Sequence, residues 1–525
     1  IYDLNNNGFF DIGDYILFYG HSPDEWKFNE STLLFEHQIN RFTEKVNYFL
    51  TIDNQSEGKR VSQKPILQEA TKIITSFHDF EFHENEYENL IHSGREWFGE
   101  RFDLQNNQSF AFSFPNLDVT TPINIKIAVA ARSLTPSVFN IQANSNQIST
   151  ISVNNVVTTY ATEYAKLASA VAEYSSPSSD IIINIDYNSS DNGALAWLNY
   201  IEINAKRELR MSDNYLLFRD ISLLSNEVGN FVLTNATSDV SVWDVSDNTN
   251  VTELITNIEL GVLSFNDSID KIHEYIAFNS NAYLAPEFEG VVENQDLHSI
   301  SSEVEYVIVS HPDFLTAADR LAQFHRNRGG LKSVVVTPQQ IYNEFSSGVQ
   351  DVTAIRDFIR MLYKKPSSQI KYLLLFGDGS YDPKDRVLEN TNYIPTYQSV
   401  NSTHPIYSYV TDDYFGLLDE NEGLFNNDEL DIGIGRFPVT NLDDANNLVD
   451  KVERYYNKEA FGSWRNDIVF VADDGDSNDG NTHMWQADSL ANYVADNYEK
   501  INIQKIYLDN YLQESTPGGP RSEAT

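Results

Sequence analysis

The pattern of hydrophobic and polar positions changes near residue 304. Upstream, apolar and polar residues alternate over short runs such as 124–130 and 180–186, separated by turns rich in Asn, Ser and Thr. This alternation is typical of half-buried strands, and its spacing over residues 101–208 predicts a β-sandwich. Residues 209–300 continue in the same style and are expected to form a second all-β domain that ends in a linker.

Downstream of that change, apolar runs alternate with segments of helical periodicity. Residues 304–309, 333–336 and 372–376 have the composition of buried strands. The segment Val352–Leu362 carries its apolar residues at helical spacing. Near-continuous apolar strands that alternate with helices are typical of a parallel sheet covered on both faces. Residues 301–525 are therefore predicted to form an α/β domain.

The first hundred residues lack a tidy repeat and mix short strands with short helices. We therefore expect a multidomain protein in which β-rich N-terminal domains, including the sandwich, precede an α/β domain with a mainly parallel sheet. The predicted domains are residues 1–100, 101–208, 209–300 and 301–525. In the last domain only the N-terminal part of the sheet is expected to be present.

Loops at the carboxyl ends of parallel strands are the expected ligand sites of such a domain. These loops are Gly377–Asp382, the segment after Arg436, and Asp473–Asp479. Asp378 in the first loop is either a functional carboxylate or part of a tight turn. The third loop either binds a cation or is a solvated loop before a helix, in which case His483 lies at the start of that helix.

Charge narrows the possible functions. The chain has 77 acidic and 36 basic residues, for a formal charge of -41. Such a surface repels phosphate backbones, so nucleic-acid binding is not expected. It suits hard cations, whose ligands are carboxylate and amide oxygens, although solubility in a salty medium explains the charge equally well.

The sequence contains no cysteine, which excludes disulfides and thiolate metal sites within these 525 residues. It also has no apolar run of membrane-spanning length and no signal peptide. Because the first residue, Ile1, lies inside a recognisable motif, we expect the chain to be a piece of a longer precursor.

That first motif has the spacing of a twelve-residue calcium loop. Its side-chain ligand types are Asp3, Asn5, Asn7, Asp11 and Asp14, with the backbone carbonyl of Phe9 at position 7 and Gly8 at the sharp turn. A shorter Asp stands where EF-hands have Glu, as in the dockerin type of loop. The alternative is an Asn-rich turn whose amides bond their own backbone. A structural Ca²⁺ is the prediction.

Two further motifs combine charge with aromatic residues. Asp412 and Asp413 lie between aromatic side chains, where they could receive a cationic substrate group or orient a catalytic histidine. They could equally cap a turn and face water. The segment Gly94–Gly99 is expected to be an aromatic core anchor with a structural ion pair and no chemistry.

Seven motifs occur in an order that resembles the gingipain family of cysteine peptidases, and within it the sortases of the type IX secretion system. They are Gly94–Glu100, Trp243–Val245, Asn294–Ser299, Leu375–Asp382, Thr411–Asp419, Ile434–Val439 and Val471–Asp476. The resemblance covers essentially the whole chain and implies a caspase-like peptidase fold preceded by β-rich domains. It also implies a cell-surface location at the outer membrane.

The implied reaction removes the C-terminal sorting domain of secreted cargo and passes the new carboxyl end to anionic lipopolysaccharide or to water. In it, a thiolate attacks the scissile carbonyl, a histidine carries the proton, and backbone amides hold the oxyanion. An outer-membrane β-barrel protein is the implied partner. The family's nucleophilic Cys and base His are expected beyond Thr525. The family's substrate-pocket acid corresponds to Asp412, with Asp413 as the weaker candidate.

Two other functions stay open at the level of sequence. A secreted degradative endopeptidase would remove its β-rich segment on activation, whereas a sortase would keep it. A non-catalytic surface scaffold or adhesin would contain an inert α/β domain. Because a half-built parallel sheet would expose an apolar edge, we expect further chain after the last residue.

Overall fold

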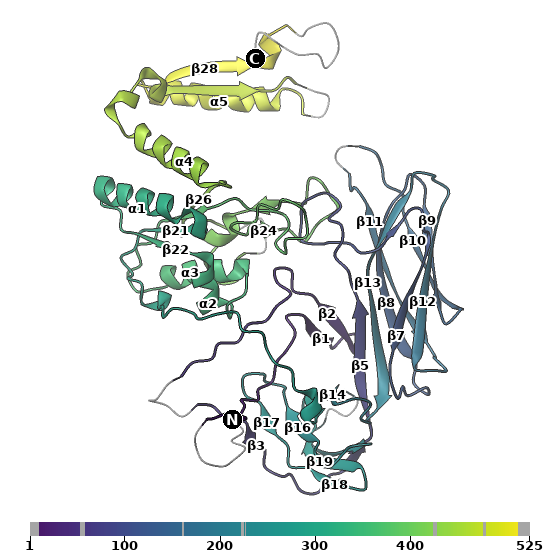
Figure 1. Ribbon diagram of the computed structural model, residues 1–525. Helices are drawn as coiled ribbons and strands as arrows, with labels where there is room; N and C mark the ends of the chain where they lie inside the picture. The colour runs from purple at the N-terminus through teal and green to yellow at the C-terminus, as the bar shows by residue number, and fades with distance from the viewer. Residues whose placement is uncertain are drawn as a thin grey trace. The chain divides into compact units, whose positions relative to one another are not determined.

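The computed structural model describes residues 10–52, 58–159, 162–221, 225, 227–423, 428–475 and 479–512, and these form two compact units, Ile1–Leu442 and Asp443–Thr525 (Figure 1). As the sequence predicted, β-rich sheets precede an α/β part with a parallel sheet. Among the helices so described, none is long and apolar enough to cross a membrane.

The β-sandwich consists of two sheets that enclose one core. The first sheet contains, in spatial order, β10 (Asn146–Val153), β9 (Ser137–Ala143), β12 (Asp180–Ser189) and β7 (Asn107–Ser113). The second contains β11 (Lys166–Tyr174), β8 (Ile123–Arg132), β13 (Leu195–Glu208) and β5 (Ser76–His83), with β6 (Arg101–Phe102) paired to β13. Alternate residues of each strand point into the core, as Ile181, Ile183 and Ile185 of β12 do.

A second pair of sheets follows in the sequence and also uses strands from the first hundred residues. One sheet contains β14 (Tyr215–Phe218), β20 (Tyr275–Phe278), β16 (Ser241–Asp244), β17 (Thr252–Glu253) and β3 (Ser62–Gln63). The other contains β18 (Asn257–Glu259), β19 (Val262–Ser268), β15 (Val228–Thr234) and β4 (Lys72–Ile74).

Residues expected as one N-terminal domain are therefore distributed over several sheets. Strands β1 (Glu25–Asn29) and β2 (Leu34–Gln38) form a hairpin, whereas β3 and β4 pair in parallel with strands more than 150 residues away, and β5 belongs to the sandwich. We call everything described upstream of residue 299 the β module.

The α/β part of the first unit contains a four-stranded parallel sheet. Its order is β22 (Ser333–Val336), β21 (Tyr306–Ser310), β23 (Tyr372–Phe376) and β26 (Gly433–Phe437). Its helices are α1 (Leu315–Gly329), α2 (Pro338–Phe345) and α3 (Val352–Tyr363). Val307 and Leu375 belong to one buried core with Ile341 of α2 and Phe358 of α3.

Local sequence fixes the ends of these helices. Thr337 and Gln340 form a reciprocal capping box at the start of α2, with a proline in its first turn. Asp351 accepts a hydrogen bond from the amide of Thr353 at the start of α3. Helix α1 ends at Gly330, whose φ of 68° is a left-handed conformation that favours glycine.

The second unit contains the parallel pair β27 (Asp467–Ala472) and β28 (Asn502–Tyr507). Its helices are α4 (Leu442–Tyr455), which begins at the boundary, and α5 (Thr482–Asn497). Helix α5 connects the two strands, as a parallel crossover requires.

Candidate functional site at the carboxyl edge of the parallel sheet

Arg436, near the end of β26, organises the carboxyl edge of the sheet. Its Nε and Nη2 donate to the two oxygens of Asp412, each at 2.7 Å. Its Nη1 donates to the carbonyls of Gly377 and Ile394 at 2.9 and 2.8 Å, and Nη2 also donates to that of Pro395 at 3.2 Å. All five donors of the guanidinium are used, so the arginine ties three chain segments together.

Asp412 in turn accepts hydrogen bonds from two residues. Besides the two bonds from Arg436, its Oδ1 accepts a bond from Thr396 Oγ1 at 3.0 Å. The side chains of Arg436 and Asp412 are only 13% and 22% exposed. The family resemblance pointed to Asp412 as the substrate-pocket acid, but its arginine partner was not predicted. Its role toward substrate stays a prediction, and its first role in the fold is to hold Arg436.

Asp413 differs from its neighbour because it is exposed. It begins the 3-10 helix Asp413–Gly416, and its amide donates to Thr411 Oγ1 at 3.0 Å. Among the described residues, no group forms a hydrogen bond or ion pair with its carboxylate. A cation from outside the chain could therefore approach Asp413 more easily than Asp412.

The loop after β23 lies against the same edge. Gly377 has a φ of 152°, and a Cβ there would lie 2.9 Å from Ile394 Cγ1. The carbonyl of Asp378 accepts bonds from the amides of Tyr393 and Ile394 at 3.1 and 2.9 Å, while its own amide donates to Val439 at 3.0 Å. These backbone bonds join Asp378 to the segments around Tyr393 and Val439, and both predicted roles of its side chain stay predictions.

His311 follows β21 at the neighbouring strand end and was not singled out from sequence. Its ring meets that of Tyr393 edge-on at 4.9 Å, and its Nδ1 accepts from the amide of Asp313 at 3.3 Å. Burial lowers the pKa of His311, an effect that Asp313 only partly opposes. The lowered pKa favours the neutral form of this imidazole.

We call residues 377–409, which lead from β23 to the Asp412 segment, the edge loop. It contains β24 (Tyr397–Gln398), which pairs antiparallel with β25 (Val410–Thr411), directly before Asp412. The edge loop contacts the β module at the Gly94–Gly99 motif, in which Trp97 and Phe98 are buried. The expected aromatic anchor is present, and its contact with the α/β part was not foreseen.

The predicted calcium loop is described only in part. Asp3, Asn5, Asn7 and Phe9 lie outside the described residues. The amide of Asp11 donates to the Asp14 carboxylate at 2.9 Å, and the amide of Asp14 donates to the Asp11 carbonyl at 3.1 Å. Calcium binding stays a prediction.

The loop Asp473–Asp479 belongs to the second unit, and residues 476–478 in it lie outside the described part of the chain. The amide of Asp474 donates to the side chain of Asp473 at 2.9 Å. His483 is the second residue of α5, and its Nε2 lies 2.9 Å from Asp479 Oδ2. His483 thus lies at the start of the helix, as predicted.

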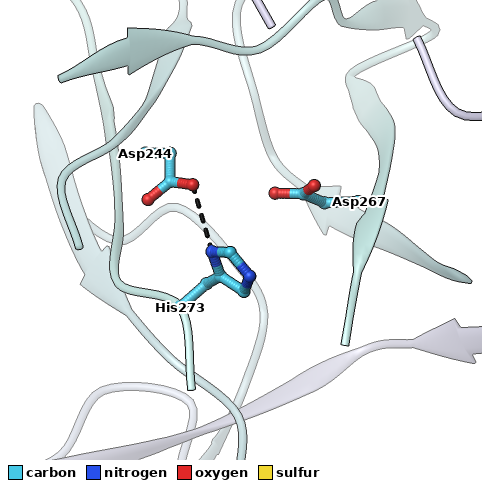
Figure 2. Close-up of side chains that lie close together, drawn as sticks. All are labelled: Asp244, Asp267 and His273. Carbon is cyan, nitrogen blue, oxygen red and sulfur yellow. Dashed lines mark hydrogen bonds and ion pairs between the residues drawn. The ribbon is translucent and has the colours of Figure 1, made fainter. Parts of the chain in front are cut away.

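A buried cluster in the second pair of sheets was missed by sequence reasoning (Figure 2). Asp244 and Asp267 face each other, and His273 Nδ1 lies 3.1 Å from Asp244 Oδ2. Lys64 Nζ donates to both carboxylates, at 2.9 and 2.6 Å. Three potential metal ligands therefore converge, but the ammonium of Lys64 occupies the position between the carboxylates that a cation would need.

The electrostatics of this cluster agree with that interpretation. Burial favours the neutral form of Asp244, but hydrogen bonds from His273, Ser246 and Lys64 outweigh it and lower the pKa of Asp244 well below its usual range. The same carboxylates raise the pKa of Lys64 against the effect of its burial. The cluster is thus a buried ion-pair network that binds the N-terminal segment to the second pair of sheets.

Comparison with known proteins defines the class to which the C-terminal part belongs. Residues 299–525 match the family model of Peptidase family C25, so this part of the chain is a domain of the gingipain family of cysteine peptidases with a caspase-like fold. The predicted family resemblance is confirmed. No curated protein matches the chain.

Among solved structures, the chain is similar to dimeric latent PorU from Porphyromonas gingivalis. The two are 24% identical, with 90% of this chain and 48% of that chain covered and a TM-score of 0.72. The chain therefore shares the fold of PorU and spans about half its length. The calcium- and xylotriose-bound carbohydrate-binding module CBM36 is 14% identical, with 25% of this chain and 99% of that chain covered, and its TM-score of 0.16 supports no conclusion.

Proposed function

We propose that the full-length protein is a cell-surface sortase of the cysteine-peptidase type. It cleaves the C-terminal sorting domain from secreted cargo and transfers the new carboxyl end to an amine of anionic lipopolysaccharide. The thiolate and histidine that this chemistry needs belong to chain outside these 525 residues. The outer-membrane location and a β-barrel partner are parts of the same proposal.

The observation that carries the proposal is the way the β module is joined to the edge loop. Glu86 of the β module lies 2.7 Å from Lys384 and 2.9 Å from Arg386 of the edge loop. These side chains are between 6% and 16% exposed. Separating the two parts would break both of these largely buried ion pairs.

That junction favours an enzyme that keeps its β module. A degradative peptidase that discards the module on activation would have to break the buried pairs beside its own substrate edge. A sortase that retains the module keeps them intact. The C25 domain supports peptidase chemistry, and the junction supports the sortase over the degradative alternative.

Within the proposed site, Asp412 and Asp413 have different tasks. Asp412 holds Arg436 and so fixes the edge loop, while Asp413, with its exposed carboxylate, meets a basic group of the cargo. Ca²⁺ at the loop Asp3–Asp14 is proposed as a structural ion that orders the start of the β module.

The test is product analysis with the full-length protein, a cargo carrying its sorting domain, and purified lipopolysaccharide. The expected product is cargo whose new carboxyl end is joined to a lipopolysaccharide amine, detected by mass spectrometry. Cleaved cargo with only a free carboxylate would indicate the degradative peptidase. Uncleaved cargo would indicate the scaffold or adhesin.

A further inference from the structure

The segment Gly94–Trp97 of the β module contacts the edge loop through its backbone. The amide of Gly94 donates to Gln398 Oε1 at 3.1 Å, and the amide of Arg95 donates to the Ser399 carbonyl at 3.0 Å. The amide of Glu96 donates to Ser402 Oγ at 2.9 Å. Three successive amides of one segment thus bind a single stretch of the edge loop, which is a specific contact.

Gly94 allows this close approach. Its φ of 81° lies in the left-handed region, and a Cβ there would lie 2.3 Å from the Asn401 carbonyl oxygen and 2.3 Å from Ser402 Oγ. Two observations therefore exclude a side chain: the backbone conformation and the absence of space. Asn89 supports the turn, since its Nδ2 donates to the Gly94 carbonyl at 2.8 Å.

The contact is continuous with the site at the sheet edge. Gln398 and its neighbour Tyr397 form β24, which pairs with β25 immediately before Asp412. The ring of Tyr397 also stacks on that of Tyr414 at 4.5 Å, and the guanidinium of Arg95 lies 5.5 Å from the centre of the Tyr397 ring. Displacement of Gly94 would therefore move the hairpin that carries Asp412.

A second contact fixes the other end of the edge loop. The ring of Tyr381 stacks on Trp97 at 5.8 Å and on His92 at 5.1 Å. The guanidinium of Arg386 lies 3.7 Å from the centre of the Trp97 ring, a cation–π geometry. The β module therefore contacts the edge loop both before and after β24, the first strand of the hairpin that precedes Asp412.

We propose that Gly94–Trp97 is a positioning element for the peptidase site: it sets the place of the β24–β25 hairpin, and through it the Asp412–Arg436 pair. Its effect on turnover rests on the proposed function, whereas its effect on the hairpin does not. This role accounts for the glycine and the tryptophan of the segment, which both contact the edge loop directly.

The test is amide hydrogen exchange in the full-length protein carrying Gly94→Ala. The amides of Gln398, Ser399 and Val410 should exchange at least about tenfold faster than in the wild type, and those of β8 should be unchanged. The matched control is Gly329→Ala at the end of α1, where an added Cβ meets nothing within 4 Å. Unchanged exchange of the hairpin in a folded Gly94→Ala protein would overturn the proposal.

A second variant covers the case in which Gly94→Ala fails to fold. Ser402→Ala removes the acceptor of the Glu96 amide without a steric clash, and it should raise hairpin exchange by a smaller factor. With active enzyme, both variants should raise KM for cargo more than they lower kcat. Faster hairpin exchange with unchanged KM would overturn the positioning role. A wild type that cleaves no cargo would contradict the proposed function and leave the exchange test standing.

Discussion

Asp412 and Arg436 form a two-point ion pair at the carboxyl edge of the parallel sheet, with both nitrogen–oxygen distances at 2.7 Å. The pair joins the end of β26 to the residue that directly follows the β24–β25 hairpin. Because the guanidinium also binds three backbone carbonyls, it determines where the loop lies. The acid that sequence assigned to substrate is thus first a structural partner.

Breaking this ion pair should lower the free energy of unfolding, and the losses from changing Asp412 and Arg436 should not be additive. Asp412→Asn leaves a half-buried arginine without its counter-charge and should lower the free energy of unfolding by about 3 kcal/mol. A double-mutant cycle with Arg436→Gln, measured by urea unfolding, should give a coupling of at least about 1 kcal/mol. Additive losses would show that the two side chains act independently. Asp413→Asn, whose carboxylate is exposed, is the control and should be nearly neutral.

His37 should make the stability of the β module depend on pH. Its two ring nitrogens lie 2.8 Å from Glu202 and 2.6 Å from Glu84. Burial opposes protonation, but the hydrogen bonds to these glutamates outweigh it and raise the pKa of His37 above its ordinary value. The stabilisation is therefore fully present below the unfolded-state pKa and is lost as pH rises through the folded-state pKa.

His37→Gln should consequently lower Tm more at about pH 6 than at about pH 9, with a loss of about 2 kcal/mol at the lower pH. Thermal unfolding across that range provides the measurement. His21→Gln is the control, because His21 is exposed on the same segment. An equal loss at both pH values would contradict a charged His37 in the folded state.

Lys64 should be the resident cation of the Asp244–Asp267–His273 cluster. Lys64→Met leaves two buried carboxylates facing each other, so the free energy of unfolding should fall by about 3 kcal/mol. Zn²⁺ should then raise the Tm of the variant but not that of the wild type, because the position between the carboxylates is free only without the lysine. Lys271→Met, which removes an exposed lysine near the cluster, should behave as the wild type does. An equal Zn²⁺ effect on wild type would show that the ammonium does not exclude a metal.

The N-terminal loop should bind calcium. The double variant Asp3→Ala, Asp11→Ala should lose the bound ion in elemental analysis and should melt earlier. At an ion concentration one hundred times Kd, the lost stabilisation would be about 2.7 kcal/mol. Chelation should reproduce the shift in the wild type and leave the variant unaffected. Equal metal content in both proteins would rule the site out.

The sheets could be predicted where an element is long enough for its periodic pattern of apolar residues to be recognised. The strand Asp180–Ser189 and the alternation of strands and helices after residue 304 are examples, since each encodes its own buried face. Strands β3 and β4 were not predictable, because they have only two and three residues and pair with distant strands. Segments of two or three residues are too short for their sequence to indicate which strands they pair with.

The site was predictable in place but not in detail. Strand topology put Asp378 and the loop after Arg436 at one edge, whereas Asp412 was suggested by the family resemblance. The pairing of Asp412 with Arg436 is a tertiary contact, and the spacing of residues along the chain does not reveal such contacts. One signal was available: Arg436 stands in an otherwise apolar strand, and a charge in such a strand needs a partner. Similarly, Gly94 directly before Arg95 indicated a backbone that something approaches closely.

We infer that the β module stays with the peptidase domain in the working enzyme, because it positions the edge loop. The most direct test labels the full-length enzyme on cells with an electrophilic peptide probe for its active thiol and records the native mass of the labelled species. The labelled enzyme should retain the β module, including the peptide that contains Trp97. A labelled, active species that begins near residue 299 and has lost that peptide would contradict it.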